Sequence, residues 1–79
     1  MEKEMNKINV AFRKFEDGEV IAIFPDIKEG DNEVLSYMHI GQHSACSVGL
    51  MDELDKANEN EYFSLKKELE NIGYSINVI

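Results

Sequence analysis

One amphipathic helix constrains the fold of this chain more than any other feature of its sequence. Asn58 is a good N-cap residue, and Glu61 stands three positions later, where its carboxylate completes a capping box. Apolar residues then recur every three or four positions up to Gly73, a residue that suits a helix end. The pattern predicts a helix over residues 59–72. Its buried stripe consists of Tyr62, Leu65, Leu69 and Ile72.

Two strand-like runs joined by a tight turn precede the helix. Residues 7–15 alternate apolar and polar side chains with a period of two, and residues 19–24 are apolar on both faces. Asp17 and Gly18 between them predict a hairpin, because glycine tolerates the positive φ of such a turn. Pro25 has no backbone NH to donate to a sheet, so we expect it to close the second strand.

The middle of the chain is less regular. Residues 25–33 are predicted as a loop, and residues 34–40 as a third strand. This strand directs Val34, Met38 and Ile40 toward the core and ends at Gly41. Residues 42–47 are expected to form a compact turn. Residues 48–56 fit either a short helical turn or a brief extended piece, whereas residues 74–79 alternate again and predict a last strand.

These elements predict an α+β fold of the order β-β-β-α-β. A small antiparallel or mixed sheet carries the amphipathic helix on one face. Residues 1–6 are expected to be a flexible N-terminal tail, and residues 7–79 a single domain. One helix covers only one face of a sheet, so the other face is a candidate interaction surface. That surface is expected to carry Ala11, Arg13, Tyr37, His39 and one side of the strand 20–24.

Charge and composition limit the classes of partner that this domain can bind. Sixteen acidic residues against eight basic ones give a net charge of −8. This charge disfavours binding to nucleic acid or to an anionic membrane, since both require clustered lysine and arginine. One cysteine cannot form an internal disulfide, and no apolar run near the N-terminus is long enough for a signal peptide or a membrane span. We expect a cytoplasmic protein whose small core is supplemented by a second copy or by a host protein.

The densest chemistry lies in the segment Ser36 to Cys46. His39, His43 and Cys46 have the spacing H-x3-H-x2-C, and imidazole and thiolate are ligands that suit zinc. A fourth ligand would come from a carboxylate such as Asp52 or from another subunit. In the alternative interpretation His39 packs on the sheet, His43 caps the turn, and no cofactor is bound.

Catalysis by Cys46 is a further alternative. The thiol needs a base such as His43, an orienting group and an oxyanion site, and only Gln42 or Ser44 is near enough in sequence to serve. No phosphate-binding glycine loop is present in the sequence. The residues therefore favour a protein that is not an enzyme.

Three segments of the chain resemble a family of small bacteriophage and mobile-element proteins of bacteria that has no assigned activity. The segments are FRKFEDGEVIAIFP, SYMHIGQHSAC and EYFSLKKELENIGYSINV. The specific matches are Tyr37, His39, Gly41, Gln42, His43, Glu61 and Tyr62. Members of that family typically carry proline and threonine capping signals before the helix, where this chain has Lys56, Asn58 and Asn60. The resemblance implies a phage or mobile-element setting.

Two functions from different classes follow from these observations. The first is an acidic accessory protein that acts by protein–protein interaction without catalysis. Its candidate interaction residues are Arg13, Tyr37, His39, Gln42, His43 and Cys46. The second is a small zinc-binding protein that uses His39, His43 and Cys46 as ligands.

Overall fold

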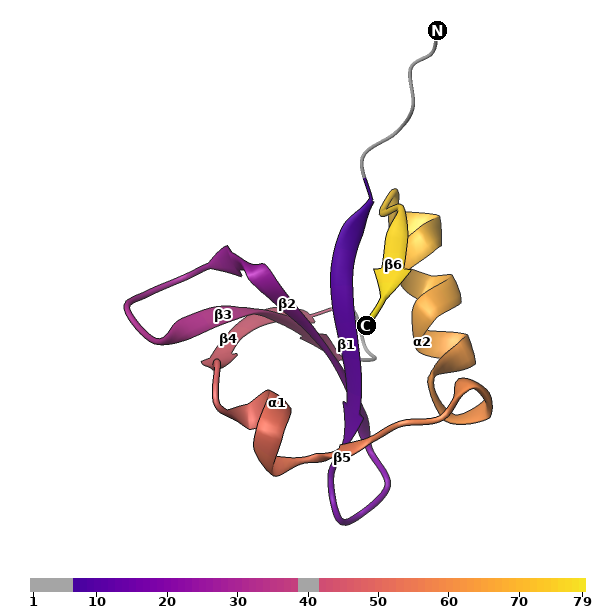
Figure 1. Cartoon of the computed structure of the whole chain (residues 1–79). Coiled ribbons are helices and arrows are strands. Elements are labelled where there is room, and N and C mark those ends of the chain that lie inside the picture. The colour runs from indigo at the N-terminus through magenta and orange to yellow at the C-terminus, as the bar shows by residue number, and fades with distance from the viewer. Residues whose placement is uncertain (1–6, 39–41) are drawn as a thin grey trace, which may run out of the picture.

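Strand β1 (Ile8–Lys14) is the centre of the fold, because it pairs with β2, β5 and β6. The computed structural model describes residues 7–38 and 42–79, apart from the side chain of Gln42 (Figure 1). The elements after β1 are β2 (Val20–Lys28), β3 (Glu33–Met38), β4 (Gln42–Ser47), α1 (Leu50–Glu53), β5 (Asp55–Lys56), α2 (Glu59–Ile72) and β6 (Ile76–Val78). The tail predicted over residues 1–6 lies outside the described residues.

The sheet has six strands in the order β4-β3-β2-β1-β5, and β6 also pairs with β1. The pairing of β1 with β6 is parallel, and the other pairings are antiparallel. The predicted α+β fold, with one main helix packed on a mixed sheet, is therefore confirmed (Figure 1). Within the described ranges, no helix has the length and apolar character needed to cross a membrane.

The hairpin between β1 and β2 forms where the sequence predicts it. Gly18 has a φ of 92°, a conformation that side chains with a Cβ rarely adopt. The Glu19 NH donates a hydrogen bond to Asp17 Oδ1 (3.0 Å), and the Phe15 NH donates to the Glu19 carbonyl (2.8 Å). These bonds close the turn and fix the register of the two central strands.

Strand β2 continues past Pro25, so the prediction that this proline closes the strand is wrong. The pairing with β3 changes register after Phe24. Pro25 therefore lies at an irregularity, where the ladder does not need its missing donor. The predicted loop over residues 25–33 shrinks accordingly to a turn, closed by a hydrogen bond from the Glu29 NH to the Glu33 carbonyl (2.8 Å).

The prediction of a compact turn over residues 42–47 is also wrong, because this segment is strand β4. It pairs antiparallel with β3, with His43 opposite Tyr37. Its small side chains give little strand signal of their own, and pairing with β3 decides its conformation. Both alternatives for residues 48–56 occur in succession, as the helical turn α1 and the two-residue strand β5.

Helix α2 begins at the predicted capping box and covers one face of the sheet. Leu65 and Leu69 are fully buried against this face, and Phe12 stacks on Tyr62 with 4.4 Å between ring centroids. Ile72 is 52% exposed, contrary to prediction, since it lies in the last turn of the helix, next to Gly73. The buried strand residues in the cluster with α2 are Val10, Phe12, Ala22, Phe24, Tyr37 and Ile76. The prediction that Tyr37 lies on the face without this helix is therefore wrong.

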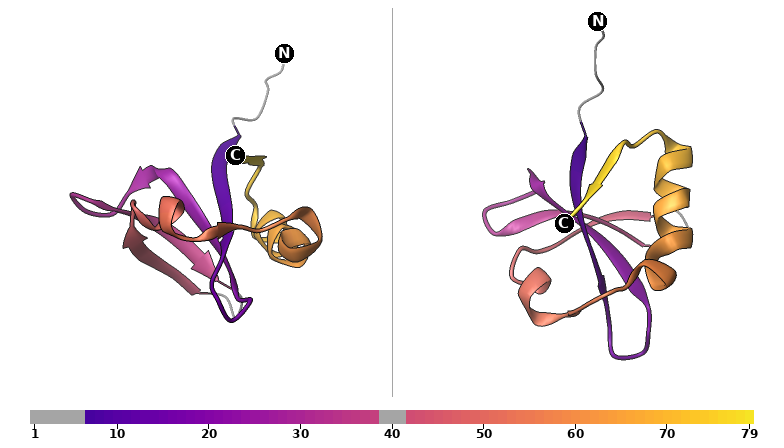
Figure 2. Two further views of the ribbon diagram at one scale, coloured as in Figure 1. Left: turned by 60° about the horizontal axis from the view of Figure 1, so that its bottom comes forward. Right: turned by 45° about the vertical axis from the view of Figure 1, so that its right-hand side comes forward.

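The opposite face of the sheet is covered as well, so the prediction of an open interaction face is wrong. Three apolar side chains in and beside α1 lie over it, namely Leu50, Met51 and Leu54. The buried residues of this face are Ala11, Ile21, Ile23 and Val34. Figure 2 shows α1 and α2 on either side of β1. Phe15, Met38 and Cys46 also pack against these residues.

Candidate functional site

Two tyrosines, a histidine and a glutamate meet beside α2. The Tyr37 hydroxyl donates a hydrogen bond to the carboxylate of Glu68. The imidazole Nε2 of His43 lies 2.9 Å from the hydroxyl oxygen of Tyr74. The rings of His43 and Tyr37 are in edge contact, with 4.7 Å between centroids. We call these four residues the tyrosine–histidine cluster.

Two strands, one helix and the loop that follows this helix bring the tyrosine–histidine cluster together. Tyr37 and His43 are directly opposite each other in the register of β3 and β4. Glu68 projects from α2, and Gly73 ends that helix with a φ of 128°. The chain can then turn back, which places Tyr74 next to His43. The sequence predicts Tyr37 and His43 as candidate residues but does not predict their partners Glu68 and Tyr74.

The electrostatics of the tyrosine–histidine cluster favour a structural role. Tyr37 is buried, and its hydrogen bond to Glu68, together with burial, raises the pKa of Tyr37 to about 12. The phenol therefore stays neutral and acts as a donor rather than as a general base at neutral pH. His43 is exposed at the margin of this cluster.

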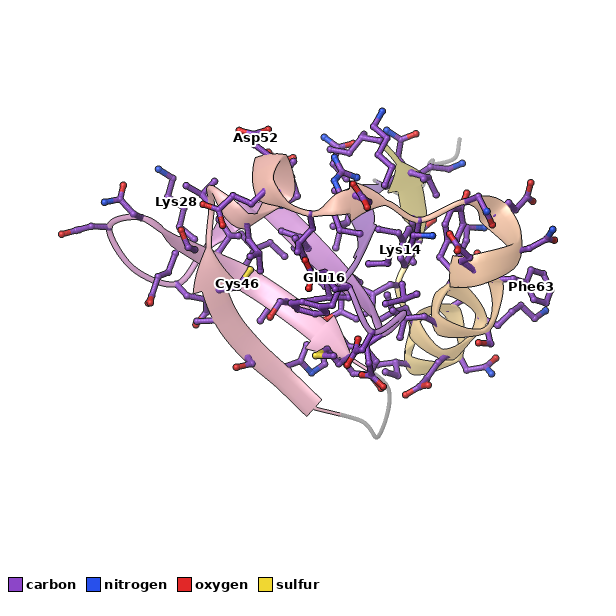
Figure 3. All side chains as sticks on the ribbon, turned by 90° about the horizontal axis from the view of Figure 1, so that it is seen from below. Lys14, Glu16, Lys28, Cys46, Asp52 and Phe63 are labelled. Atoms are coloured by element: carbon purple, nitrogen blue, oxygen red, sulfur yellow. The ribbon has the colours of Figure 1, made fainter. Side chains whose placement is uncertain are left out.

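Cys46 lies on the other face of the sheet from His43. Its side chain packs against the buried residues of the face beneath α1, such as Val34. Figure 3 shows Cys46 on that side of β4. Burial raises the pKa of the Cys46 thiol, and this effect is larger than the lowering of the pKa by the hydrogen bond with Ser36. The thiol is therefore protonated at neutral pH. Successive residues of a strand alternate between faces, so Cys46 and His43 do not form a nucleophile–base pair.

The same alternation separates two of the three predicted zinc ligands, His43 and Cys46. The third, His39, lies outside the described residues, and Gln42 is placed only by its backbone in β4. In the part of the chain that the structure describes, no three side chains of histidine, cysteine, aspartate or glutamate are grouped as metal ligands.

Arg13, predicted for an interaction surface, is buried beneath α1 instead. Its Nε donates a hydrogen bond to the Met51 carbonyl (2.9 Å), and its Nη1 donates to the Phe12 carbonyl (3.2 Å). Because Met51 belongs to α1, the first of these bonds ties that helix to β1. Arg13 therefore holds the cover of the sheet in place.

Strand β4 is an edge of the sheet, and its sequence lacks the usual protection of an edge. It is the last strand on its side of the sheet, and Figure 3 shows it at the margin of the molecule. Its sequence, QHSACS, contains no lysine, no acidic residue and no proline. Natural edges commonly carry such residues, or a bulge, because exposed NH and carbonyl groups can pair with another strand. The pairing of β4 with β3 is regular throughout.

Hydrogen bonds identify which backbone groups of β4 point outward. The Val48 NH donates to the Asn32 carbonyl (2.8 Å), and the Ser44 carbonyl accepts from Ser36 Oγ (3.1 Å). Even-numbered residues thus direct their backbone groups toward β3. Backbone groups alternate along an antiparallel strand, so those of His43, Ala45 and Ser47 point away from the sheet. Sequence reasoning missed this edge because it predicted a turn here.

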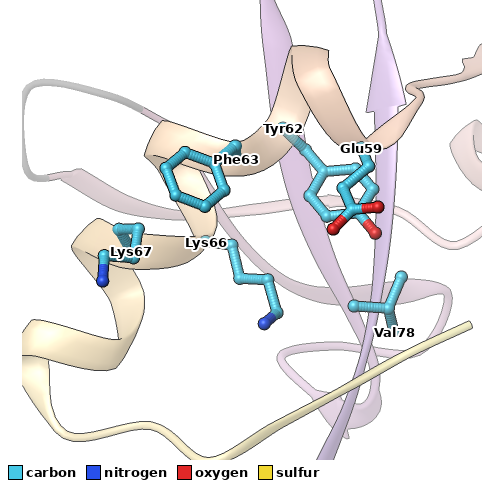
Figure 4. Close-up of a pocket in the computed structure, with 6 residues that line it drawn as sticks. All are labelled: Glu59, Tyr62, Phe63, Lys66, Lys67 and Val78. Carbon is cyan, nitrogen blue, oxygen red and sulfur yellow. The ribbon is translucent and has the colours of Figure 1, made fainter.

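A shallow groove between α2 and β6 is the second exposed feature. Its volume is about 170 Å³. The lining residues are Glu59, Tyr62, Phe63, Lys66, Lys67 and Val78 (Figure 4). Phe63 is 55% exposed and carries Lys67 near its ring, with 6.0 Å from Nζ to the centroid. The signal in the sequence is a phenylalanine that falls outside the buried stripe of the helix.

Comparison with protein-family models, with curated proteins and with solved structures finds no match for this chain. The phage and mobile-element resemblance carried by Tyr37, His39 and Gln42 therefore stays a prediction. What the protein does is inferred from its own contacts, charges and exposed backbone.

Proposed function

We propose that the chain is a non-catalytic accessory protein that binds another polypeptide by strand addition at β4. In strand addition, an extended segment of the partner pairs with an exposed sheet edge through backbone hydrogen bonds. The observation that carries the proposal is the six-residue uncharged edge, with outward backbone groups at His43, Ala45 and Ser47. The sequence resemblance adds a bacteriophage or mobile element as the setting.

Three features support binding rather than catalysis. Both faces of the sheet are already covered, so the edges are the places where the sheet can be extended. Tyr37 is held neutral by Glu68, and Cys46 is separated from His43. The net charge of −8 favours a protein partner over a nucleic acid.

Strand addition is tested by removing the backbone NH of Ala45, an outward-pointing donor in the middle of β4. Ala45→Pro removes the NH of Ala45, which points away from β3, so the ladder inside the sheet keeps its bonds. Ala45→Thr changes the same side chain but keeps the NH and serves as the matched control. Both variants carry a photo-crosslinking amino acid at the exposed Ser44 and are irradiated in cells that express the protein.

We expect crosslinked adducts of defined mass from the wild-type background and from Ala45→Thr, and their loss in Ala45→Pro. A crosslinker at Asp52, which is exposed on α1, controls for random collisions. Thermal unfolding of both variants checks that the fold persists. Adducts that persist in the proline variant, or that form equally from Asp52, would contradict strand addition at β4.

A further inference from the structure

We infer that the strand added to β4 is the β4 strand of a second copy, related to the first by a twofold axis at Ala45. This inference rests on the proposed function and specifies its partner. The two antiparallel strands then join the sheets of both copies into one continuous sheet. A twofold contact of this kind uses the same surface on both subunits.

The register follows from the backbone groups that point outward. An antiparallel pair centred on Ala45 places Ala45 opposite Ala45 of the second copy, and His43 opposite Ser47 of the second copy. This register uses all three outward residues of both strands. A pair centred on Ser44 leaves Ser47 without a partner, and one centred on Cys46 leaves His43 without a partner. The register centred on Ala45 therefore forms the most hydrogen bonds.

The side chains of β4 are compatible with this pairing. All of its residues except Gln42 and His43 are small. No two like charges come to lie opposite each other, as they would on a charged edge. The competing edge strands, β5 and β6, have only two and three residues, so they offer fewer backbone bonds to a partner.

Charge remote from β4 acts against the dimer. Each copy carries a net charge of −8, none of it on β4 itself. Two such chains repel at low ionic strength, and salt screens that repulsion. Dimerisation is therefore expected to strengthen as salt is added, whereas a partner of opposite charge would bind more weakly.

A disulfide tests the register directly. When the two β4 strands pair in this register, Ser44 lies opposite Cys46 of the second copy. These two residues form a non-hydrogen-bonded pair of the antiparallel ladder. The Cα atoms of such pairs are about 4.5 Å apart, which a disulfide can span. Ser44→Cys should therefore form, on mild oxidation, a crosslinked species with twice the 9.0 kDa chain mass. Reduction should return it to the single chain.

Two controls separate this bond from chance oxidation. Ser44→Cys combined with Cys46→Ser removes the partner thiol and should lose the crosslink. Asp52→Cys places an exposed thiol on α1, away from the edge, and should give only background dimer. A crosslink that survives Cys46→Ser would overturn the register.

Sedimentation equilibrium tests the dimer without any crosslink. Ala45→Pro removes both bonds of the central pair and should weaken dimerisation about 30-fold, whereas Ala45→Thr should not. Wild-type protein that remains monomeric up to about 1 mM in about 0.5 M salt would overturn self-pairing. If the crosslinks at Ser44 still depend on Ala45 in that case, strand addition stands and the partner is a different protein.

Discussion

The hydroxyl of Tyr37 and the carboxylate of Glu68 are hydrogen-bonded across the junction of β3 and α2. Tyr37 is only 2% exposed, so this bond joins the sheet to the helix from inside the covered face. A hydrogen bond from a buried donor to a charged acceptor contributes more to stability than a bond between neutral groups.

Tyr37→Phe should therefore lower the free energy of unfolding by about 2 kcal/mol. The ring is retained, so the loss reports the hydrogen bond rather than a cavity. Urea denaturation at neutral pH measures it. Tyr74→Phe is the matched control, because its hydroxyl bonds to the exposed His43 and should contribute less. Equal losses in the two variants would contradict the assignment.

The raised pKa of Tyr37 predicts a dependence of stability on alkaline pH. In the folded state this pKa is about 12, above its ordinary value of 10.0, so folding favours the neutral phenol. The stabilisation is complete below pH 10 and is lost as the pH rises through the folded pKa near 12. The stability difference between wild type and Tyr37→Phe should thus shrink across this range. A difference that stays constant would show that the phenol does not titrate with folding.

The ion pair between Lys14 and Glu61 predicts that the stability of the fold depends on pH in the acid range. Their side chains are 2.6 Å apart, and the hydrogen bond from Lys14 lowers the pKa of Glu61 below its ordinary value of 4.5. Stability from this pair is present above pH 4.5 and is lost as the pH falls through the lowered pKa. Lys14→Met should flatten the pH dependence of unfolding in that range. Lys66→Met, which breaks the exposed pair with Glu70, is the control and should change it less.

The contact between Arg13 and α1 predicts that replacing Arg13 destabilises α1 locally rather than the whole fold. Arg13→Met removes the donor to the Met51 carbonyl, so the contact that ties α1 to β1 is lost. Amide hydrogen exchange should become faster in α1 than in α2. Arg13→Lys keeps the charge without the planar guanidinium and should give an intermediate result. Uniform acceleration over both helices would show that Arg13 stabilises the whole fold instead.

The parts of the fold that could be predicted are those with strong local signals. Gly18 in the hairpin turn, Asn58 at the N-cap and Gly73 at the helix end each impose a backbone conformation by themselves. Strand β4 and helix α1 could not be predicted in this way. Their conformations depend on β3 and on the sheet face beneath Leu50 and Met51, which are contacts distant in sequence.

The candidate site shows the same division. Tyr37 and His43 are brought together as neighbouring strands require, but the expected joining of His43 and Cys46 fails. Their separation of three residues would suit one face of a helix, whereas on a strand it places them on opposite faces. The prediction of a turn over residues 42–47 therefore missed both the separation of His43 from Cys46 and the exposed edge at β4.

Strand β6 lies in parallel beside β1, with Ile76 next to Ile8. During synthesis the hairpin of β1 and β2 leaves the ribosome well before β6, and before α1 and α2, which cover its two faces. Contacts so distant along the chain form late, because closing a long loop costs entropy. We expect the sheet of the nascent chain to gain its last partner strand only after all of α2 has been synthesised.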